Sequence, residues 1–462
     1  MKVIKNGSTG TAKIIYRKKL SSEAEYRLSL FTYLYSENGR YLVRSTFTGE
    51  TAELTEQEWN SVQQMKNAPV SYDFIAENGL EQLAMSRIIV ETGYDDVKQY
   101  QQTVFLMKTM AGNKNGINSY VILPTTGCNA RCVYCYEESY AVKTMTPETA
   151  DRVVDYICET RHDDTVKLRW FGGEPLANAK IISRICSGLR DRGVPYKSSM
   201  VTNASLMTKE LAHEAKELWN LIGVQVSLDG IKEDYGIRKN YYSPEKHNYD
   251  VVMKSIHYLT DEGIKVRCRV NVDMENIGHI PEFLNEMKAE FGGNENVALY
   301  LAPLSREQRR ERALELLTEI LRLTDMQYSM GIRHSFKSSK GAKKDTHIRV
   351  NYCMADSMNK SVLITPDGLF NNCEHLPETQ TWGNIFDGIT DKAKFDELCT
   401  APKVDVKCAE CPFLPECTPF FKTGCPGWFE KCREYKGIET EHRLHSLLEG
   451  RNNVTDDDDG EI

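Results

Sequence analysis

Three cysteines in one short segment constrain this chain more than any other feature of its sequence. Residues 126–136 read TGCNARCVYCY, so Cys128, Cys132 and Cys135 have the spacing CxxxCxxC. The apolar run at residues 120–123 comes just before them and is typical of a short buried strand. We therefore expect the three thiols on the loop that leaves the carboxyl end of this strand, where α/β barrels place their chemistry.

Thiols spaced in this way are suited to chelating a soft metal. Three thiolates can hold three irons of a four-iron, four-sulfur cluster and leave the fourth iron open to a substrate or cofactor. A structural zinc knuckle and a disulfide pair are the alternative interpretations, and three clustered thiols suit neither of them well.

The same segment resembles the cysteine loop of radical S-adenosylmethionine (SAM) enzymes, in which an aromatic residue, here Tyr134, precedes the last cysteine. The resemblance implies that the open iron binds the amino and carboxylate groups of SAM. It also implies that reductive cleavage of SAM gives a 5′-deoxyadenosyl radical, which abstracts hydrogen from a substrate. The fold that it implies is a partial (β/α)6 barrel, whose open side admits a large substrate.

Composition indicates an ordinary globular protein. The chain has 462 residues, of which 40% are hydrophobic and 27% charged, which suggests about two to four domains. Residues 1–20 contain no apolar signal segment and no stretch approaches the roughly 18–20 apolar residues of a membrane span, so we expect a cytoplasmic protein without a membrane partner. In that compartment its 14 cysteines are better suited to metals than to disulfides. The net charge of -8 argues against nucleic-acid binding.

Residues 1–112 contain no cysteine and are expected to form a small α+β domain. Asn38-Gly39 predicts a tight hairpin turn, and Thr55 with Glu58 predicts a capping box at the start of a helix. The order of elements resembles the winged, leader-peptide-binding (RRE-like) domains of peptide-modifying radical enzymes, and a packing or dimerisation domain is the alternative. The expected elements are strands at 26–34, 41–47 and 88–90 and helices at 56–65 and 80–86.

Residues 113–335 alternate strand and helix patterns, which predicts an α/β domain with a parallel sheet or barrel. The expected strands are 120–123, 166–171, 196–201, 222–228, 264–272 and 297–301. The expected helices are 147–160, 179–190, 209–219, 249–262, 280–290 and 306–330.

Polar motifs follow the strands of this region in order. Gly172-Gly173-Glu174 follows the second strand: glycines allow close backbone approach to a ligand, and the carboxylate is an acceptor. By resemblance this GGEP motif holds the methionine ammonium group of SAM. Asn203 ends the third strand in a threonine-asparagine-glycine pattern, with Ala204 in place of the glycine.

The next two strands carry the remaining candidates for SAM binding. Ser227 and Asp229 end the fourth strand, and by similarity they face the methionine and ribose portions of SAM. Arg269 and Asn271 alternate on the fifth strand and therefore point the same way, and a guanidinium suits a carboxylate. Each motif alone is weak evidence, because a turn, a strand end or a surface salt bridge would look the same. Their order along successive strands supports the assignment.

Eight of the cysteines lie between residues 353 and 432 and mark a second metal-rich region. It resembles the SPASM domain, an auxiliary-cluster module of many radical SAM maturases, and is expected over residues 336–445, with an acidic disordered tail at 446–462. The chain departs from the usual pattern in having seven residues between Cys417 and Cys425, where three are usual. The cysteines that match the pattern are Cys353, Cys373, Cys408, Cys411, Cys417, Cys425 and Cys432.

By position, two auxiliary four-iron clusters are implied, which makes three clusters in all. Cys408, Cys411, Cys417 and Cys432 are assigned to the first. Cys353, Cys373 and Cys425 are assigned to the second cluster, which is therefore one ligand short. Either Cys399 completes it, or one of its irons stays open to a substrate thiolate. Zinc in one or both sites is the alternative, because two CxxC-like pairs also describe zinc ribbons.

Glu374 is the candidate catalytic residue, since it follows Cys373 where sulfatase-maturating relatives carry an acidic base, although a solvated glutamate is an equal alternative. The resemblance implies a maturase of a ribosomally made precursor peptide that forms a thioether or other cross-link, with a flavodoxin-like or ferredoxin-like protein as its reductant. A sulfatase maturase that produces formylglycine is the alternative within the family. A non-catalytic electron-transfer or metal-binding scaffold is the alternative outside it.

Overall fold

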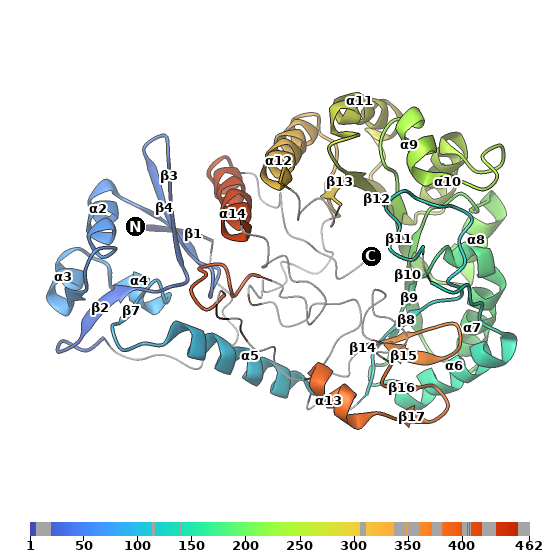
Figure 1. Cartoon of the computed structure of the whole chain (residues 1–462), viewed down its shortest axis with the longest axis horizontal. Helices are drawn as coiled ribbons and strands as arrows, with labels where there is room; N and C mark the ends of the chain where they lie inside the picture. Colours follow the sequence, from blue (N-terminus) through green and yellow to red (C-terminus); the bar gives the residue numbers. More distant parts are fainter. Residues whose placement is uncertain are drawn as a thin grey trace. The chain divides into compact units, whose positions relative to one another are not determined.

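The computed structural model forms two compact units (Figure 1). It describes residues 1–5, 20–112, 116–138, 140–304, 311–336, 348, 361–371, 381–399, 404, 406, 408–417 and 431–450. One unit comprises Met1–Ala111, Lys337–Tyr352 and Ala401–Thr455, and the other comprises Gly112–Phe336, Cys353–Thr400 and Asp456–Ile462. Within the described ranges, no helix combines the length and apolar character that a membrane span requires.

The larger unit is built on six parallel strands that follow one another in the sheet in chain order. This order confirms the predicted partial (β/α)6 barrel. The strands are β8 (Ser119–Ile122), β9 (Val166–Trp170), β10 (Tyr196–Thr202), β11 (Leu221–Ser227), β12 (Lys265–Val272) and β13 (Val297–Pro303).

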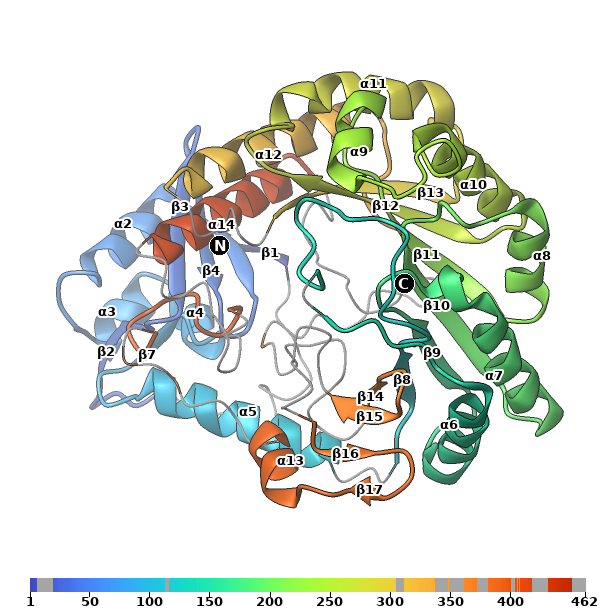
Figure 2. The same cartoon turned by 45° about the vertical axis from the view of Figure 1, so that its right-hand side comes forward.

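Helices connect these strands and lie along the outside of the curved sheet (Figure 2). Apart from the polar helix α9, they form where the sequence is amphipathic, and their apolar faces join those of the strands in one core. They are α6 (Pro147–Thr160), α7 (Ala179–Asp191), α8 (Lys209–Glu217), α9 (Lys232–Lys239), α10 (Tyr249–Asp261), α11 (Ile280–Phe291) and α12 (Ala313–Ser329), with short 3-10 turns η1 (Pro175–Asn178) and η2 (Ile277–His279). The sequence pattern did not predict α9, and it placed the start of α12 too early.

Four short strands extend the sheet beyond β8. β14 (Ser361–Ile364) pairs with β8 in parallel, and β15 (Leu369–Asn371), β16 (Gly383–Asn384) and β17 (Gly388–Ile389) follow in antiparallel order. Helix α13 (Lys392–Cys399) comes next along the chain. The structure thus groups residues 361–371 and 381–399 with the barrel, although the sequence analysis placed them in a separate C-terminal domain.

The smaller unit contains a four-stranded antiparallel sheet in the order β1-β5-β4-β3 and a three-stranded sheet in the order β6-β2-β7. The turn at Asn38 and Gly39 has φ values of 48° and 76°, as a two-residue hairpin requires, and the capping box at Thr55 and Glu58 is present. The strands are β1 (Lys2–Lys5), β2 (Glu25–Leu28), β3 (Thr32–Glu37), β4 (Arg40–Ser45), β5 (Thr51–Leu54), β6 (Val70–Ser71) and β7 (Ile89–Glu91); the helices are α2 (Glu56–Gln64), α3 (Tyr72–Glu77), α4 (Glu81–Met85), α5 (Asp96–Gly112) and α14 (Cys432–Leu448).

Residues 26–34 were predicted as one strand, and that prediction is wrong. They form two strands, β2 and β3, which belong to different sheets. The chain turns between them, where the backbone N–H of Thr32 donates to the carbonyl of Ser29 at 3.1 Å.

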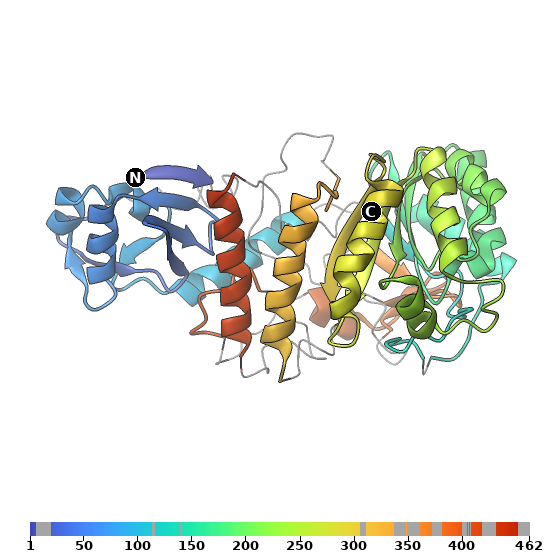
Figure 3. The ribbon, with the colours of Figure 1, turned by 90° about the horizontal axis from the view of Figure 1, so that it is seen from above.

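Both faces of the four-stranded sheet are covered. Val43 and Ala52 on one face pack into a core with residues of α2, α3 and α4. On the other face, Tyr33 of β3 donates a hydrogen bond to Glu441 of α14 at 2.7 Å, and α14 lies alongside the sheet (Figure 3). The N-terminal sheet and the C-terminal helix therefore form one folding unit.

Candidate active site

The cysteine loop leaves the carboxyl end of β8, as predicted, and it is held by the segment that ends α9. The backbone N–H of Arg131 donates to the carbonyls of Lys239 and Asn240 at 3.2 and 3.0 Å, and that of Val133 donates to Arg238 at 3.0 Å. Asn240 ends α9 in the left-handed conformation, with φ of 46°, which turns the chain toward the loop. A helix that the sequence pattern missed thus positions the loop.

Cys128, Cys132 and Cys135 are half-buried and form no disulfide. Burial is the main cause that raises the pKa of Cys128 to about 12, and negative charge on Glu174 and on the other two cysteines adds to it. The three thiols are therefore close enough to influence one another electrostatically.

Soft thiol ligands of this kind suit an iron–sulfur cluster, because metal binding stabilises thiolates that burial disfavours. Among the residues that the structure describes, no three His, Cys, Asp or Glu side chains are grouped tightly enough to mark a metal site. The assignment of these cysteines as ligands stays a prediction that rests on donor chemistry and spacing.

The two glycines after β9 permit a close approach, and the group that they approach is the cysteine loop itself. A Cβ on Gly172 would lie 2.3 Å from the carbonyl oxygen of Thr125, and one on Gly173 would lie 2.5 Å from those of Thr126 and Gly127. The backbone N–H of Glu174 also donates to Gly127 at 2.9 Å. The GG pair therefore fixes the first residues of the cysteine loop against the end of β9.

Glu174 is completely buried and ties the ends of β9 and β10 together. Its carboxylate accepts hydrogen bonds from Thr202 Oγ1 at 2.6 Å, from the backbone N–H of Asn203 at 2.8 Å and from that of Leu176 at 3.0 Å. Burial is the main cause that raises the pKa of Glu174, and these hydrogen bonds oppose it. In this structure, the predicted SAM ligand binds groups of the chain itself.

Asn203 lies beside the first cysteine. Its Nδ2 is 3.9 Å from Cys128 Sγ and donates to Asn129 Oδ1 at 2.9 Å, while its Oδ1 accepts from Ser205. The next residue, Ala204, has φ of 59°, a conformation in which glycine is the least strained residue. This explains why a glycine would be expected in the motif at that position.

Asp229, at the end of β11, is the centre of a buried polar cluster that sequence reasoning predicted only in part. It accepts hydrogen bonds from Tyr134, the residue before Cys135, and from Asn271 Nδ2 at 2.8 Å. Lys239 Nζ lies 3.2 Å from the same carboxylate and donates to Tyr134 at 2.8 Å. Tyr134, Asp229, Lys239 and Asn271 thus connect the cysteine loop with β11, α9 and β12.

Two basic residues at the end of α9 were missed. Arg238 forms a buried, two-pronged ion pair with Asp273, at 3.1 and 3.0 Å, and its guanidinium lies 5.6 Å from the centre of the Tyr134 ring. Lys239 is only 2% exposed. Burial is the largest single effect and disfavours its ammonium, but Asp229, Tyr134 and Cys132 together outweigh burial and raise the pKa of Lys239 well above its usual value. In the sequence, both look like part of an ordinary solvated charge run.

Ser227 and Arg269 are opposite each other on neighbouring strands β11 and β12. Arg269 Nε donates to Asn271 Oδ1 at 2.9 Å, and Arg269 Nη1 donates to the Tyr300 hydroxyl at 3.4 Å. The structure thus places the predicted residues of the barrel at one edge of the sheet. Glu374, Cys353, Cys373 and Cys425 lie outside the described residues, as does the side chain of Cys399.

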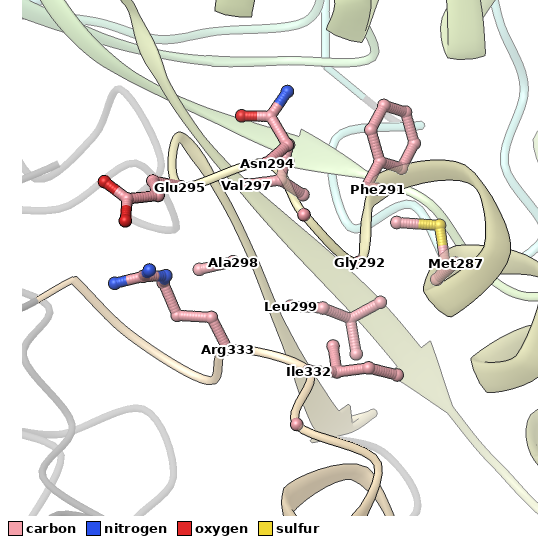
Figure 4. A pocket seen from close by; sticks show the side chains of 12 residues that line it. Met287, Phe291, Gly292, Asn294, Glu295, Val297, Ala298, Leu299, Ile332 and Arg333 are labelled. Atoms are coloured by element: carbon pink, nitrogen blue, oxygen red, sulfur yellow. The ribbon is translucent and has the colours of Figure 1, made fainter.

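A cavity of about 210 Å³ lies at the opposite edge, beside the amino end of β13. Glu295 and Arg333 line one side of it and Phe291 lines another (Figure 4). Because parallel strands share their carboxyl edge, this cavity is remote from the cysteine loop and does not belong to the site.

Four cysteines of the C-terminal region, Cys408, Cys411, Cys417 and Cys432, belong to the smaller unit, whereas Cys399 ends α13 in the larger unit. Cys408, Cys411 and Cys417 lie on a segment of tight turns, in which the backbone N–H of Cys411 donates to the carbonyl of Cys408 at 3.0 Å. Cys432 is the first residue of α14, and all four side chains are half-buried. This donor set is chemically suited to an iron–sulfur cluster or to zinc.

Comparison with known proteins agrees with this site. The Radical SAM superfamily model matches residues 122–287. The chain is 28% identical over 177 residues to an uncharacterized protein of Methanocaldococcus jannaschii, covering 38% of this chain and 60% of the relative. It is 24% identical over 319 residues to the antilisterial bacteriocin subtilosin biosynthesis protein AlbA of Bacillus subtilis, covering 63% of this chain and 64% of AlbA. The chain thus spans less than two thirds of the length of these relatives.

Two solved structures share the fold. The structure of anSMEcpe with bound AdoMet superposes with a TM-score of 0.57 at 19% identity and covers 73% of this chain and 100% of its own. That of Streptococcus suis SuiB bound to precursor peptide SuiA has a TM-score of 0.51 at 15% identity and covers 88% of this chain and 99% of its own. Membership of the matched family implies SAM and a four-iron cluster as cofactors. Residues 122–287, the part of the chain that the Radical SAM superfamily model matches, are thus a radical SAM domain.

Proposed function

We propose that this protein modifies a ribosomally made precursor peptide by radical SAM chemistry, forming a thioether or another side-chain cross-link. The observation that carries the proposal is the three-cysteine loop at the carboxyl edge of the barrel, in contact with the buried cluster around Asp229. The similarity to AlbA, a bacteriocin biosynthesis protein, supports a peptide as the substrate.

Cys128, Cys132 and Cys135 would hold the catalytic cluster. When bound, such a cluster supplies the electron that cleaves SAM reductively. The chain's own residues would orient the cofactor: Asn203 borders the cysteine loop, Tyr134 belongs to it, and Lys239 and Asn271 fix the position of the Asp229 carboxylate. Because these groups are buried, they also exclude water from the site.

The N-terminal domain supports a peptide substrate over a sulfatase. The SuiB structure covers 88% of this chain, whereas the anSMEcpe structure covers 73%. The structure of SuiB bound to its precursor peptide SuiA thus aligns with more of this chain than the structure of anSMEcpe does. Formylglycine formation remains the second candidate, because the anSMEcpe fold is also shared.

We propose that the leader of the precursor binds along β3. This strand is at the edge of its sheet, so it can accept an added strand from a peptide. An open groove of about 580 Å³ runs beside it, lined by residues of β3, by Arg27 and by the exposed Lys66. Lys66 suits a leader with an acidic residue, whereas Arg27 is already paired with Asp96 at 3.0 Å.

Candidate precursor peptides encoded near the gene test this function. Under anaerobic reducing conditions with SAM, we expect mass spectrometry to show the loss of two hydrogen atoms for each cross-link formed. An aldehyde at a cysteine or serine would instead support formylglycine formation. For the leader site, we expect Lys66→Glu to weaken peptide binding and Lys98→Glu, an exposed lysine on α5 outside the groove, to leave it unchanged.

A flavodoxin-like and a ferredoxin-like protein are the two reductants proposed for the catalytic cluster. The peptide assay distinguishes them when each in turn replaces a chemical reductant such as dithionite. We further propose that the C-terminal cysteines hold two auxiliary clusters, with Glu374 as a base near the second. Iron and sulfide analysis tests the number of clusters.

A further inference from the structure

Arg44 is a buried cation in the middle of the N-terminal sheet, far in sequence from the cysteines of the C-terminal region. It lies on β4 and is 0% exposed. Its Nη1 donates to the carbonyl of Gly49 at 3.3 Å and to Thr51 Oγ1 at 3.1 Å, which fixes the guanidinium within the sheet. Burial of a charge is costly unless a counter-charge compensates for it.

The counter-charge comes from the cysteine segment. Arg44 Nη2 donates to Glu416 Oε1 at 2.5 Å, and Glu416 immediately precedes Cys417. The other carboxylate oxygen of Glu416 accepts from Arg443 of α14 at 3.4 Å. Glu416 is therefore held between the N-terminal sheet and the helix that begins at Cys432.

Two further contacts fasten the same segment to the sheet. Thr46 Oγ1 donates a hydrogen bond to the carbonyl of Pro412. The rings of Tyr33 and Phe413 lie 5.2 Å apart, and Phe413 is buried. Residues 411–417 thus contact β3, β4 and the residue just after β4, all on one face of the sheet.

Well-packed apolar residues often stabilise a protein interior as well as a buried ion pair does, and in some proteins the buried charges instead fix the geometry of a contact. We propose that Arg44, through Glu416, is a positioning residue for an auxiliary iron–sulfur cluster held by Cys408, Cys411, Cys417 and Cys432. The N-terminal domain is then part of the scaffold of this cluster as well as a candidate leader-binding domain. This inference rests on the proposed auxiliary cluster.

The test measures metal that belongs only to the C-terminal cysteines. In a chain that carries Cys128→Ala, Cys132→Ala and Cys135→Ala, the iron and sulfide that remain after anaerobic reconstitution report on the auxiliary sites. Into this background we introduce Arg44→Met, which removes the charge and keeps much of the side-chain volume. The readouts are iron content, zinc content and the rate of iron release to a chelator.

Two matched controls separate positioning from general stability. Arg40→Met removes a cation four residues earlier on β4, which pairs with Glu53 at 2.6 Å and donates to the carbonyl of Leu448, at the end of α14 remote from Cys432, at 2.9 Å. Val43→Ala creates a cavity on the opposite face of the same strand, so it destabilises the domain without touching residues 411–417. Thermal unfolding of each variant shows how far the fold itself is weakened.

We expect Arg44→Met to release iron about 10- to 100-fold faster than the background, as loss of an outer partner does in other metal sites. Arg40→Met and Val43→Ala should release iron at the background rate, even where Val43→Ala lowers the melting temperature as much. Equal release from Arg44→Met and Val43→Ala at equal melting temperature would overturn the positioning role. If the background protein holds no iron, or zinc alone, the proposed auxiliary cluster is wrong and this inference fails with it. The proposal that Cys128, Cys132 and Cys135 hold the catalytic cluster does not depend on this result.

Discussion

Lys239 Nζ lies 3.2 Å from Asp229 Oδ2, and the two side chains are buried, with exposures of 2% and 0%. The two residues do not belong to a common sequence motif, because Lys239 ends α9 and Asp229 follows β11. Their ion pair includes Tyr134, the residue before Cys135, through hydrogen bonds to both partners. It therefore connects β11 and α9 with the cysteine loop.

Lys239→Met tests this connection. Removing one partner of a buried pair leaves the Asp229 charge uncompensated, which costs about 3–5 kcal/mol. Urea unfolding should show a loss of this size. Lys232→Met is the matched control: Lys232 pairs with Asp250 at 2.6 Å on the surface, where both side chains are more than half exposed, and its loss should cost no more than about 1 kcal/mol. Equal effects of the two variants would contradict the importance of the buried pair.

The pH dependence of the same pair has a definite sign. Burial lowers the pKa of Lys239, but the charge of Asp229 and the smaller effects of Tyr134 and Cys132 together raise it well above its usual value. A raised lysine pKa gives stability that is fully present below the unfolded-state pKa, about 10.4, and is lost as pH rises through the folded-state pKa. The difference in unfolding free energy between wild type and Lys239→Met should stay constant at neutral pH and shrink only above about pH 10.4. A decrease at neutral pH would contradict this assignment.

Gly173→Ala should displace the cysteine loop. The added Cβ would lie 2.5 Å from the carbonyl oxygens of Thr126 and Gly127, which belong to the backbone and have little room to move. Iron analysis should show the loss of about four irons per chain, the content of one cluster. Gly278→Ala provides the control, because nothing lies within 4 Å of its added Cβ. Full iron content in Gly173→Ala would show that the loop tolerates this displacement.

Glu174→Ala should destabilise the barrel. It would leave three buried donors without their acceptor: the backbone N–H groups of Leu176 and Asn203 and the Thr202 hydroxyl. Each buried group left unsatisfied costs about 1–3 kcal/mol. Denaturant unfolding measures the total, and Glu282→Ala, at an exposed position of α11, should change it by less than about 0.5 kcal/mol. A small effect of Glu174→Ala would indicate that water replaces the carboxylate.

The strands of the barrel could be predicted because their signal is local. Buried runs such as residues 166–170 are bounded by amphipathic helical patterns, and each strand lies within one or two residues of its expected place. The motifs at the strand ends could be predicted for the same reason. Their chemical partners could not, because Glu174 and Gly173 bind parts of the chain that only the fold brings near.

The misses have physical causes. Helix α9 is polar, contains Gly236 and buries Arg238 and Lys239, so it lacks the apolar period that marks a helix. The strand predicted at residues 26–34 is broken by a turn within a continuous apolar alternation, which periodicity alone cannot detect. The joining of residues 401–455 to the N-terminal sheet depends on contacts such as Arg44–Glu416, between residues 372 positions apart.

Formation of 5′-deoxyadenosine from SAM under anaerobic reduction with dithionite is the most direct test of the central claim, that an open cluster on the cysteine loop cleaves SAM. We expect the wild-type protein and Cys158→Ala, a change at a half-buried cysteine of α6, to form this nucleoside. Cys132→Ala should form none. A wild-type protein that leaves SAM intact, or an undiminished yield from Cys132→Ala, would contradict the claim.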